Sequence, residues 1–299
     1  MKRIVVISLR PWHVLSVAAV LVVIALAVAC WPRPVAGGEG GYAETFYSNS
    51  EALPVYANEN QGAMLAVIID DFGSGRDGVS QMMAIDRHLT FAVLPYEPFT
   101  KDNAEQGNKL GYEIIVHLPM EPVHGKTNWL GPNGILCSQD SQKISALTRM
   151  ALHDVPYAKG ANVHMGSKAS ADDRVIGCII DEVAKAGMFF VDSKTGAKSV
   201  ILSIADKAGV PCLERNVFLD GQQPKSYVLK QLRQAQGIAL KQGYAVAIGH
   251  VGVEGGKVTA EAIREMLPEL DKNGVRLVFV SELMQALGIL EQKQTAASN

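Results

Sequence analysis

Two adjacent aspartates, Asp70 and Asp71, follow a short hydrophobic run, residues 64–69, and precede a turn that contains glycine. The run is rich in β-branched residues, which is typical of a strand buried on both faces. Such a strand has no place for ionised side chains inside it. At the carboxyl ends of their strands, however, parallel α/β sheets gather their active-site groups. Because Asp near Gly is also ordinary turn chemistry, the pair alone predicts either a chemical site or a solvated turn.

Acids and histidines recur at the ends of later apolar runs. They are His117, His164, Asp192, Asp220 and His250. A single histidine after a strand is usually a structural residue, but in a parallel α/β protein all of these side chains would reach one mouth of one sheet. A shared site for metal binding or acid-base chemistry is the simpler explanation.

A repeating order of strands and helices predicts the parallel sheet that such a site requires. Further apolar runs typical of strands lie at residues 90–94, 112–116, 161–163, 188–191, 216–219, 244–248 and 275–280. Apolar residues at helical spacing predict helices between most of them, around residues 144–151, 228–240 and 260–270 and more clearly around residues 175–183. A glycine stands where several helices would end before a strand: Gly111, Gly187, Gly243 and Gly274. About seven or eight such units fit a (β/α) barrel, complete or missing a strand, better than a doubly wound sheet.

The N-terminal segment, residues 1–31, predicts an export signal or a membrane anchor. Basic side chains up to Arg10 precede an uncharged apolar stretch over residues 14–30. Three alternatives stay open: a retained anchor, cleavage after the small residues 27–29, and lipidation at Cys30. All three carry the folded domain across the membrane.

The rest of the chain divides by composition into three parts. Residues 32–62 are rich in Gly, Pro, Ser, Asn and Glu and predict a flexible linker. Residues 63–290 predict one folded domain, and the small polar residues 291–299 a disordered tail.

Composition and missing motifs disfavour several classes of partner. The net charge is -2 and no Lys/Arg-rich block occurs, which argues against nucleic acid. The turn at residues 73–75 lacks the remaining residues of a dinucleotide fingerprint or a P-loop, which argues against nucleotides. Beyond Cys30, the cysteines Cys137, Cys178 and Cys212 lack metal-ligand spacing and are an odd number for a disulfide framework.

Five motifs, taken in order, closely resemble the divergent polysaccharide deacetylases over nearly all of residues 64–287. They are Ile69-Asp70-Asp71-Phe72-Gly73, Val116-His117-Leu118-Pro119-Met120-Glu121-Pro122, Asn162-Val163-His164-Met165-Gly166-Ser167, Phe190-Val191-Asp192-Ser193-Lys194-Thr195 and Ile248-Gly249-His250. That family looks like a remote branch of the NodB-like carbohydrate esterase deacetylases. The resemblance implies a distorted (β/α) barrel of about seven parallel strands with a divalent metal, most commonly zinc, at its mouth.

The resemblance also implies roles for the motif residues. Asp70 would be the general base, Asp71 and His117 metal ligands, and His250 the general acid. The parent family has a second metal-binding histidine four residues after the first, where this chain has Glu121. The third ligand is therefore Glu121 or His164. We favour His164, because imidazole suits zinc well.

The implied activity is hydrolysis of acetyl groups from N- or O-acetylated sugars of a bacterial envelope polysaccharide, in the periplasm or on the extracytoplasmic face. Arg215 could pair with Asp70 and hold it ionised, and Asp192 or Asp220 could orient a ligand histidine. Trp129, in a loop rich in Gly, Pro and Asn, could stack on a sugar ring.

Two other functions compete with this one. The missing second histidine would fit a catalytically inactive, membrane-tethered carbohydrate-binding or scaffolding module of the same fold. A phosphoester hydrolase would need two metals or an arginine clamp, and among the strand-end residues only Arg215 is an arginine.

Overall fold

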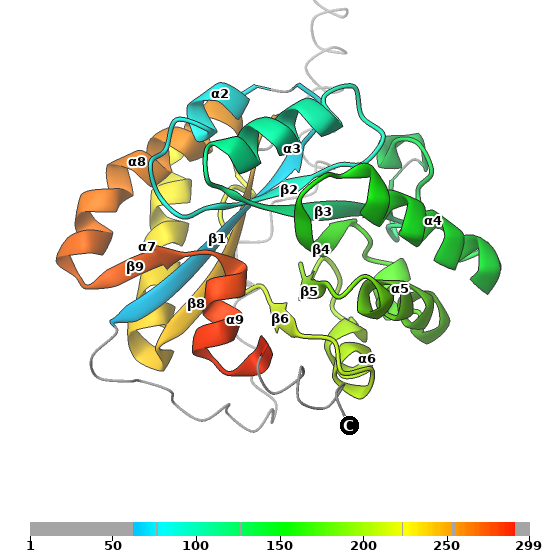
Figure 1. Cartoon of the computed structure of the whole chain (residues 1–299). Helices are drawn as coiled ribbons and strands as arrows, with labels where there is room; N and C mark the ends of the chain where they lie inside the picture. Colours follow the sequence, from blue (N-terminus) through cyan, green and yellow to red (C-terminus); the bar gives the residue numbers. More distant parts are fainter. Residues whose placement is uncertain (1–61, 76, 126, 223, 253–254, 291–299) are drawn as a thin grey trace, which may run out of the picture. The chain divides into compact units, whose positions relative to one another are not determined.

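The computed structural model describes residues 62–290 except 76, 126, 223 and 253–254 (Figure 1). The predicted leader, almost all of the linker and the predicted tail lie outside the described residues. Among the helices of the described part, none is both long and apolar enough to cross a bilayer. The described residues fall within or beside the domain predicted over residues 63–290.

Strands and helices alternate along this domain. The strands are β1 (Ala63–Phe72), β2 (Thr90–Val93), β3 (Glu113–Met120), β4 (Ala158–Met165), β5 (Phe189–Asp192), β6 (Cys212–Glu214), β7 (Val217–Phe218), β8 (Tyr244–His250) and β9 (Val275–Val278). The helices are α2 (Val79–Met82), α3 (Thr100–Lys109), α4 (Ser141–Asp154), α5 (Asp173–Lys185), α6 (Ile201–Lys207), α7 (Lys225–Gln242), α8 (Gly256–Lys272) and α9 (Val280–Ala286), with short 3-10 turns η1 (Thr127–Leu130) and η2 (Ala169–Ala171). The strands pair in parallel, which confirms the predicted architecture.

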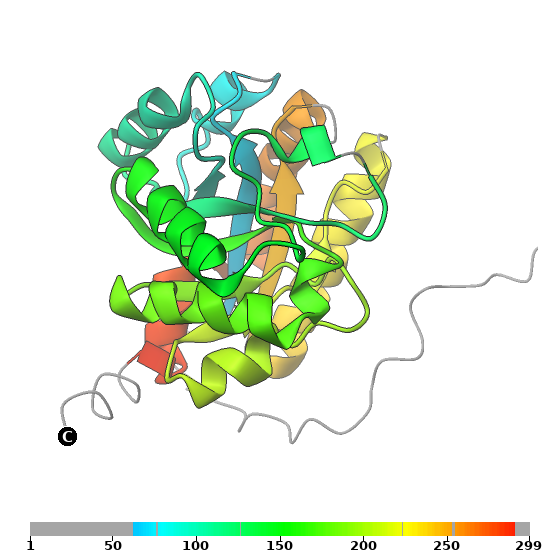
Figure 2. The ribbon, with the colours of Figure 1, turned by 90° about the vertical axis from the view of Figure 1, so that its right-hand side faces the viewer.

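The sheet curls into a distorted barrel with the helices outside it (Figure 2). Neighbouring strands follow the order β6-β5-β4-β3-β2-β1-β8-β7. β6 and β7 are two halves of one kinked segment, because β6 pairs with β5 whereas β7 pairs with β8. This segment brings the two ends of the sheet together. The strand order above contains eight labelled strands. With β6 and β7 counted as one, it becomes a ring of seven strands, as expected for this class of barrel.

The last strand departs from the prediction. The apolar run at residues 275–280 predicts one strand, but β9 ends at Val278 and Val280 begins α9. β8 pairs along one edge of β1, so β9 and β2 share the other edge. On that edge β9 pairs with residues 63–66 of β1, and β2 pairs with β1 from Ile68 onward. β9 therefore lies outside the ring, and the chain turns from it into α9 beneath the barrel (Figure 1).

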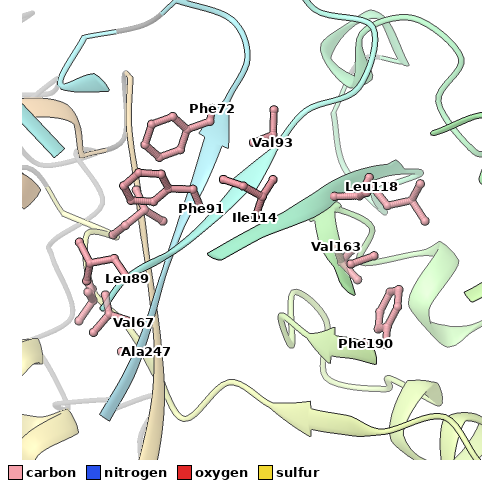
Figure 3. Close-up of a cluster of buried hydrophobic side chains, with 14 of the residues drawn as sticks. Val67, Phe72, Leu89, Phe91, Val93, Ile114, Leu118, Val163, Phe190 and Ala247 are labelled. Carbon is pink, nitrogen blue, oxygen red and sulfur yellow. The ribbon is translucent and has the colours of Figure 1, made fainter. Parts of the chain in front are cut away.

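Two hydrophobic cores follow from the alternation of side chains along each strand. Residues that face outward pack under the helices, among them Val67, Phe91 and Phe190 (Figure 3). Residues that face inward form a second core inside the barrel, to which α9 contributes Leu283 and Met284. α9 thus closes the end at which the strands begin. The opposite end, where β1, β3, β4 and β8 terminate, carries the polar residues.

Candidate active site

Asp70 and Asp71 both line the mouth of the barrel, although neighbouring residues of a regular strand face opposite sides. Asp71 has a left-handed backbone with φ 71°, and the pairing of β1 with β2 shifts register between Ile69 and Phe72. This irregularity turns the second carboxylate toward the same cavity as the first. A left-handed residue other than Gly costs about 1–3 kcal/mol, and such strain concentrates at functional sites.

Three side chains beside this turn form a compact group of metal-ligand type. His117 of β3 and His164 of β4 lie next to Asp71. Asp71 Oδ1 is 3.5 Å from His117 Nε2 and 3.2 Å from His164 Nδ1, and the two ring nitrogens are 3.1 Å apart. Ligand atoms bound tetrahedrally to Zn²⁺ at about 2.0–2.1 Å would be separated by about 3.3 Å. The spacing of the three atoms therefore fits a zinc ion.

Asp70 lies between two histidines and differs electrostatically from Asp71. Its Oδ2 is 3.7 Å from His117 Nε2 and 4.0 Å from His250 Nε2. Burial raises the pKa of Asp70, and the charges of both histidines oppose that rise without cancelling it. Burial also acts on Asp71, but hydrogen bonds with His117 and His164 outweigh it and hold the pKa of Asp71 well below its usual range. Asp70 is thus suited to accept a proton and Asp71 to remain an anion.

His250 is held in place by Asp220. Asp220 Oδ1 lies 2.8 Å from His250 Nδ1, and Asp220 Oδ2 accepts hydrogen bonds from the His250 backbone N–H and the Thr259 hydroxyl, both at 2.7 Å. A Cβ at position 255 would collide with Asp220 Oδ2, so Gly255 is required there. Burial opposes the charged imidazolium, but the contact with Asp220, together with the charges of Asp70 and Asp71, outweighs this effect and raises the pKa of His250 to about 10. His250 is therefore a charged proton donor at neutral pH.

Asn162 links this network together, and the sequence analysis did not select it. Its Oδ1 lies 2.7 Å from His117 Nδ1, and its Nδ2 donates a hydrogen bond to Asp70 Oδ1 at 2.7 Å. Asn162 stands two residues before His164 in β4, so the two side chains face the same side of the sheet. That spacing was the signal in the sequence that could have identified it.

Arg215 does not contact Asp70 directly, as the predicted pairing would require, although the charges of Asp192 and Asp70 both oppose the effect of burial on the pKa of Arg215. Its guanidinium donates hydrogen bonds to the backbone carbonyls of Ser193 and Lys194, at 2.6 and 2.9 Å, and lies over the ring of Phe218. Within the described part of the chain no ion pair between Arg215 and Asp70 forms. The side chain that hydrogen-bonds Asp70 directly is the amide of Asn162.

Asp192 cannot orient a ligand histidine, because it lies on the outer face of its strand. Phe190 packs in the outer core and Val191 in the inner one, so Asp192 faces outward with Phe190. Its Oδ1 accepts a hydrogen bond from the backbone N–H of Lys194. Ser193, one residue further on, lines the cavity in its place. Of the two aspartates proposed to orient a histidine, Asp220 does so, but for His250 and not for a metal ligand.

Glu121 is engaged away from the Asp-His-His group. Its Oε1 pairs with Lys168 Nζ and its Oε2 accepts a hydrogen bond from the backbone N–H of Cys137, both at 2.7 Å. These contacts tie the end of β3 to the loops that follow β3 and β4. The structure places His164, and not Glu121, beside Asp71 and His117.

The cavity at the mouth has a volume of about 290 Å³. Besides the aspartates and histidines above, it is lined by residues that the sequence analysis did not select, including His124, Met165, Ser193, Thr195 and Phe218. Trp129 is exposed on η1, and a Cβ on Gly125 would touch both Trp129 and Met165, so the indole flanks the rim. A larger cavity of about 770 Å³ lies beside α9 at the other end, where ion pairs such as Arg87–Asp271 occupy the surface.

These features define a class: parallel (β/α)-barrel proteins with a candidate Asp-His-His metal site at the carboxyl ends of the strands. The family model of the divergent polysaccharide deacetylases matches residues 67–284. The chain belongs to this family, as its motifs predicted.

Relatives support this assignment. The chain is 30% identical over 206 residues to the uncharacterized protein YibQ of Escherichia coli K12, a match that covers 69% of this chain and 64% of YibQ. It is 32% identical over 186 residues to an uncharacterized protein of Haemophilus influenzae, covering 62% of this chain and 66% of that protein. The chain thus spans a little under two thirds of the length of each. The crystal structure of the uncharacterized protein ATU2773 from Agrobacterium tumefaciens C58 shares the fold, with a TM-score of 0.70 at 20% identity over 75% of this chain and 89% of that one.

Proposed function

We propose that this protein is a metal-dependent hydrolase that removes acetyl groups from N- or O-acetylated sugars of an envelope polysaccharide. The observation that carries the proposal is the group of Asp71, His117 and His164, of which the first two are buried and the third is partly exposed. Their ligand atoms lie within 4.8 Å of one another beside Asp70 and His250. One carboxylate and two imidazoles are a donor set that suits zinc. Membership of the deacetylase family supports an acetylated polysaccharide as the substrate.

The residues around this group can divide the chemistry of acetyl hydrolysis. A zinc ion, when bound, would polarise the acetyl carbonyl and lower the pKa of water. Asp70 Oδ1 is occupied by the Asn162 amide, which leaves Oδ2 to take the proton of the attacking water. His250, charged through its contact with Asp220, would protonate the departing nitrogen or oxygen. Asp70 and His250 thus act as base and acid on neighbouring sides of the cavity.

The surroundings of the cavity support a sugar polymer as the substrate. Trp129 is exposed near the rim and would offer the apolar face of its indole to a sugar ring. The basic and apolar leader predicted at residues 1–31 supports action outside the cytoplasm, with the domain anchored, lipidated or released.

Removal and return of the metal tests the proposal. Protein treated with a chelator is expected to lose acetate release from acetylated oligosaccharides by about 100-fold or more, and zinc is expected to restore it. N-acetylated and O-acetylated oligosaccharides are assayed side by side with an enzyme-coupled acetate measurement. A protein that binds the glycan, holds no metal and releases no acetate would instead be the inactive carbohydrate-binding module.

Replacement of Asp220 by Asn is expected to move the alkaline limb of the pH-rate profile to lower pH. Asp220 is the largest of the influences that raise the pKa of His250 to about 10, so the imidazolium persists through neutral pH in the native protein. Without that carboxylate the pKa should fall toward the ordinary value of about 6.5, and the proton donor is then lost as the pH rises through 7–8. The measurement is kcat against pH for the zinc-loaded protein. Asp181→Asn, an exposed change on α5, is the control, and an unmoved limb in Asp220→Asn contradicts the assignment.

A further inference from the structure

We propose that Asn162 is a positioning residue that couples the general base Asp70 to the metal ligand His117 through the two ends of one amide. The inference rests on the proposed function, because it assigns Asn162 a part in the same site. It starts from the two 2.7 Å contacts of the Asn162 side chain, one to each of these residues.

The chemistry of the three groups fixes the direction of both hydrogen bonds. An ionised carboxylate only accepts hydrogen bonds, so Asp70 Oδ1 must face the amide nitrogen of Asn162. The amide oxygen of Asn162 is then left to accept a hydrogen bond from His117. Nδ1 of His117 must therefore carry a proton. In this tautomer the lone pair of His117 is on Nε2, the atom that lies among the proposed ligand atoms of Asp71 and His164. Asn162 thus selects the form of His117 that can bind a metal.

The same amide fixes the orientation of the base. By occupying Asp70 Oδ1, Asn162 leaves Oδ2 as the oxygen nearer to His117 Nε2 and His250 Nε2. A buried carboxylate needs hydrogen-bond partners, and Arg215 donates its own to backbone carbonyls. A neutral amide supplies the partner without adding a positive charge beside the metal site.

The position of Asn162 in the sheet makes it a rigid bridge. Asn162 is in register with His117 on β3 and with Val191 on β5, so its backbone is paired on both sides. Its side chain is completely buried and reaches across the barrel interior to Asp70 on β1. A support of this kind behind a metal ligand typically affects metal affinity by about 10–100-fold.

Two substitutions separate the two halves of the bridge in the full-length protein. Asn162→Ala removes both contacts, and we expect zinc affinity to fall about 10–100-fold and kcat at saturating zinc to fall about 100-fold with KM little changed. Asn162→Asp keeps an acceptor for His117 but repels Asp70, so zinc affinity should stay within about threefold of wild type while kcat still falls. Zinc affinity is measured by competition with a chromophoric chelator, independently of turnover.

Gln236→Ala is the matched control, because Gln236 is a buried amide on α7 that donates to the backbone carbonyl of Glu269, away from the site. Zinc affinity and kcat should be unchanged in this variant. The inference would be overturned if Asn162→Ala kept the zinc affinity and kcat of wild type. It would also be overturned if Gln236→Ala lost as much zinc affinity and kcat as Asn162→Ala. If Asn162→Asp loses zinc as Asn162→Ala does, the role of Asn162 as hydrogen-bond acceptor for His117 is overturned. If Asn162→Asp has a normal kcat, the role of Asn162 as hydrogen-bond donor to Asp70 is overturned. Wild-type protein that binds no zinc would instead overturn the proposed function.

Discussion

The Asp70→Asn protein is expected to release acetate at least about 100-fold more slowly than wild type while it retains its zinc. Asp70 lies beside the three proposed metal ligands and is not itself a ligand. Asn has nearly the same shape as Asp and keeps an oxygen for the Asn162 amide, but it cannot take a proton from water. Loss of a general base typically lowers turnover by about 10²–10⁴-fold. Acetate release and the zinc content of the same preparation are the two measurements.

Asp71→Asn is the matched comparison, since it makes the same chemical change one residue further on. Asn tolerates the left-handed backbone found at this position, so the fold should be spared. The variant should instead lose zinc, because it removes the charged ligand. Near wild-type turnover in Asp70→Asn, or zinc loss equal to that of Asp71→Asn, would contradict the division of roles between the two aspartates.

The architecture could be predicted from the sequence because its strands are buried on both faces. Such strands are continuous apolar runs, and Gly at the helix ends marks where the next strand begins. α3 was indicated only by Gly111 at its end. Its helical period could not be recognised, because the side it buries consists of small and polar residues such as Asn103, Ala104 and Gly107. β6 has three residues, too few to show any period, so the closure of the barrel was not visible in the sequence.

The candidate site could be predicted only in part. Acids and histidines at strand ends indicated Asp71, His117, His164 and His250, because parallel strands bring their carboxyl ends together. The choice between Asp192 and Ser193 depends on a register of one residue, and an apolar run does not specify its register to that precision. The contacts of Arg215 are with backbone carbonyls, which every residue has, so no sequence pattern could distinguish them from an ion pair with Asp70.

His164→Ala is expected to abolish stoichiometric zinc binding, and Glu121→Ala to preserve it. His164 Nδ1 lies 3.2 Å from Asp71 Oδ1 and 3.1 Å from His117 Nε2, whereas both carboxylate oxygens of Glu121 are engaged by Lys168 and the backbone of Cys137. With only two protein ligands left, His164→Ala should hold zinc too weakly to survive dialysis. The zinc-to-protein ratio after dialysis and the rate of acetate release are measured for both variants, with His117→Ala as a control for metal loss.

Glu121→Ala should show a different defect. Its carboxylate ties β3 to the loops around Cys137 and Lys168, so the variant should unfold at a lower temperature while its zinc ratio and turnover at low temperature stay close to wild type. The reverse pattern, with zinc lost in Glu121→Ala and kept in His164→Ala, would make Glu121 the third ligand. That result would also require Lys168 and the Cys137 backbone to release the carboxylate when the metal binds.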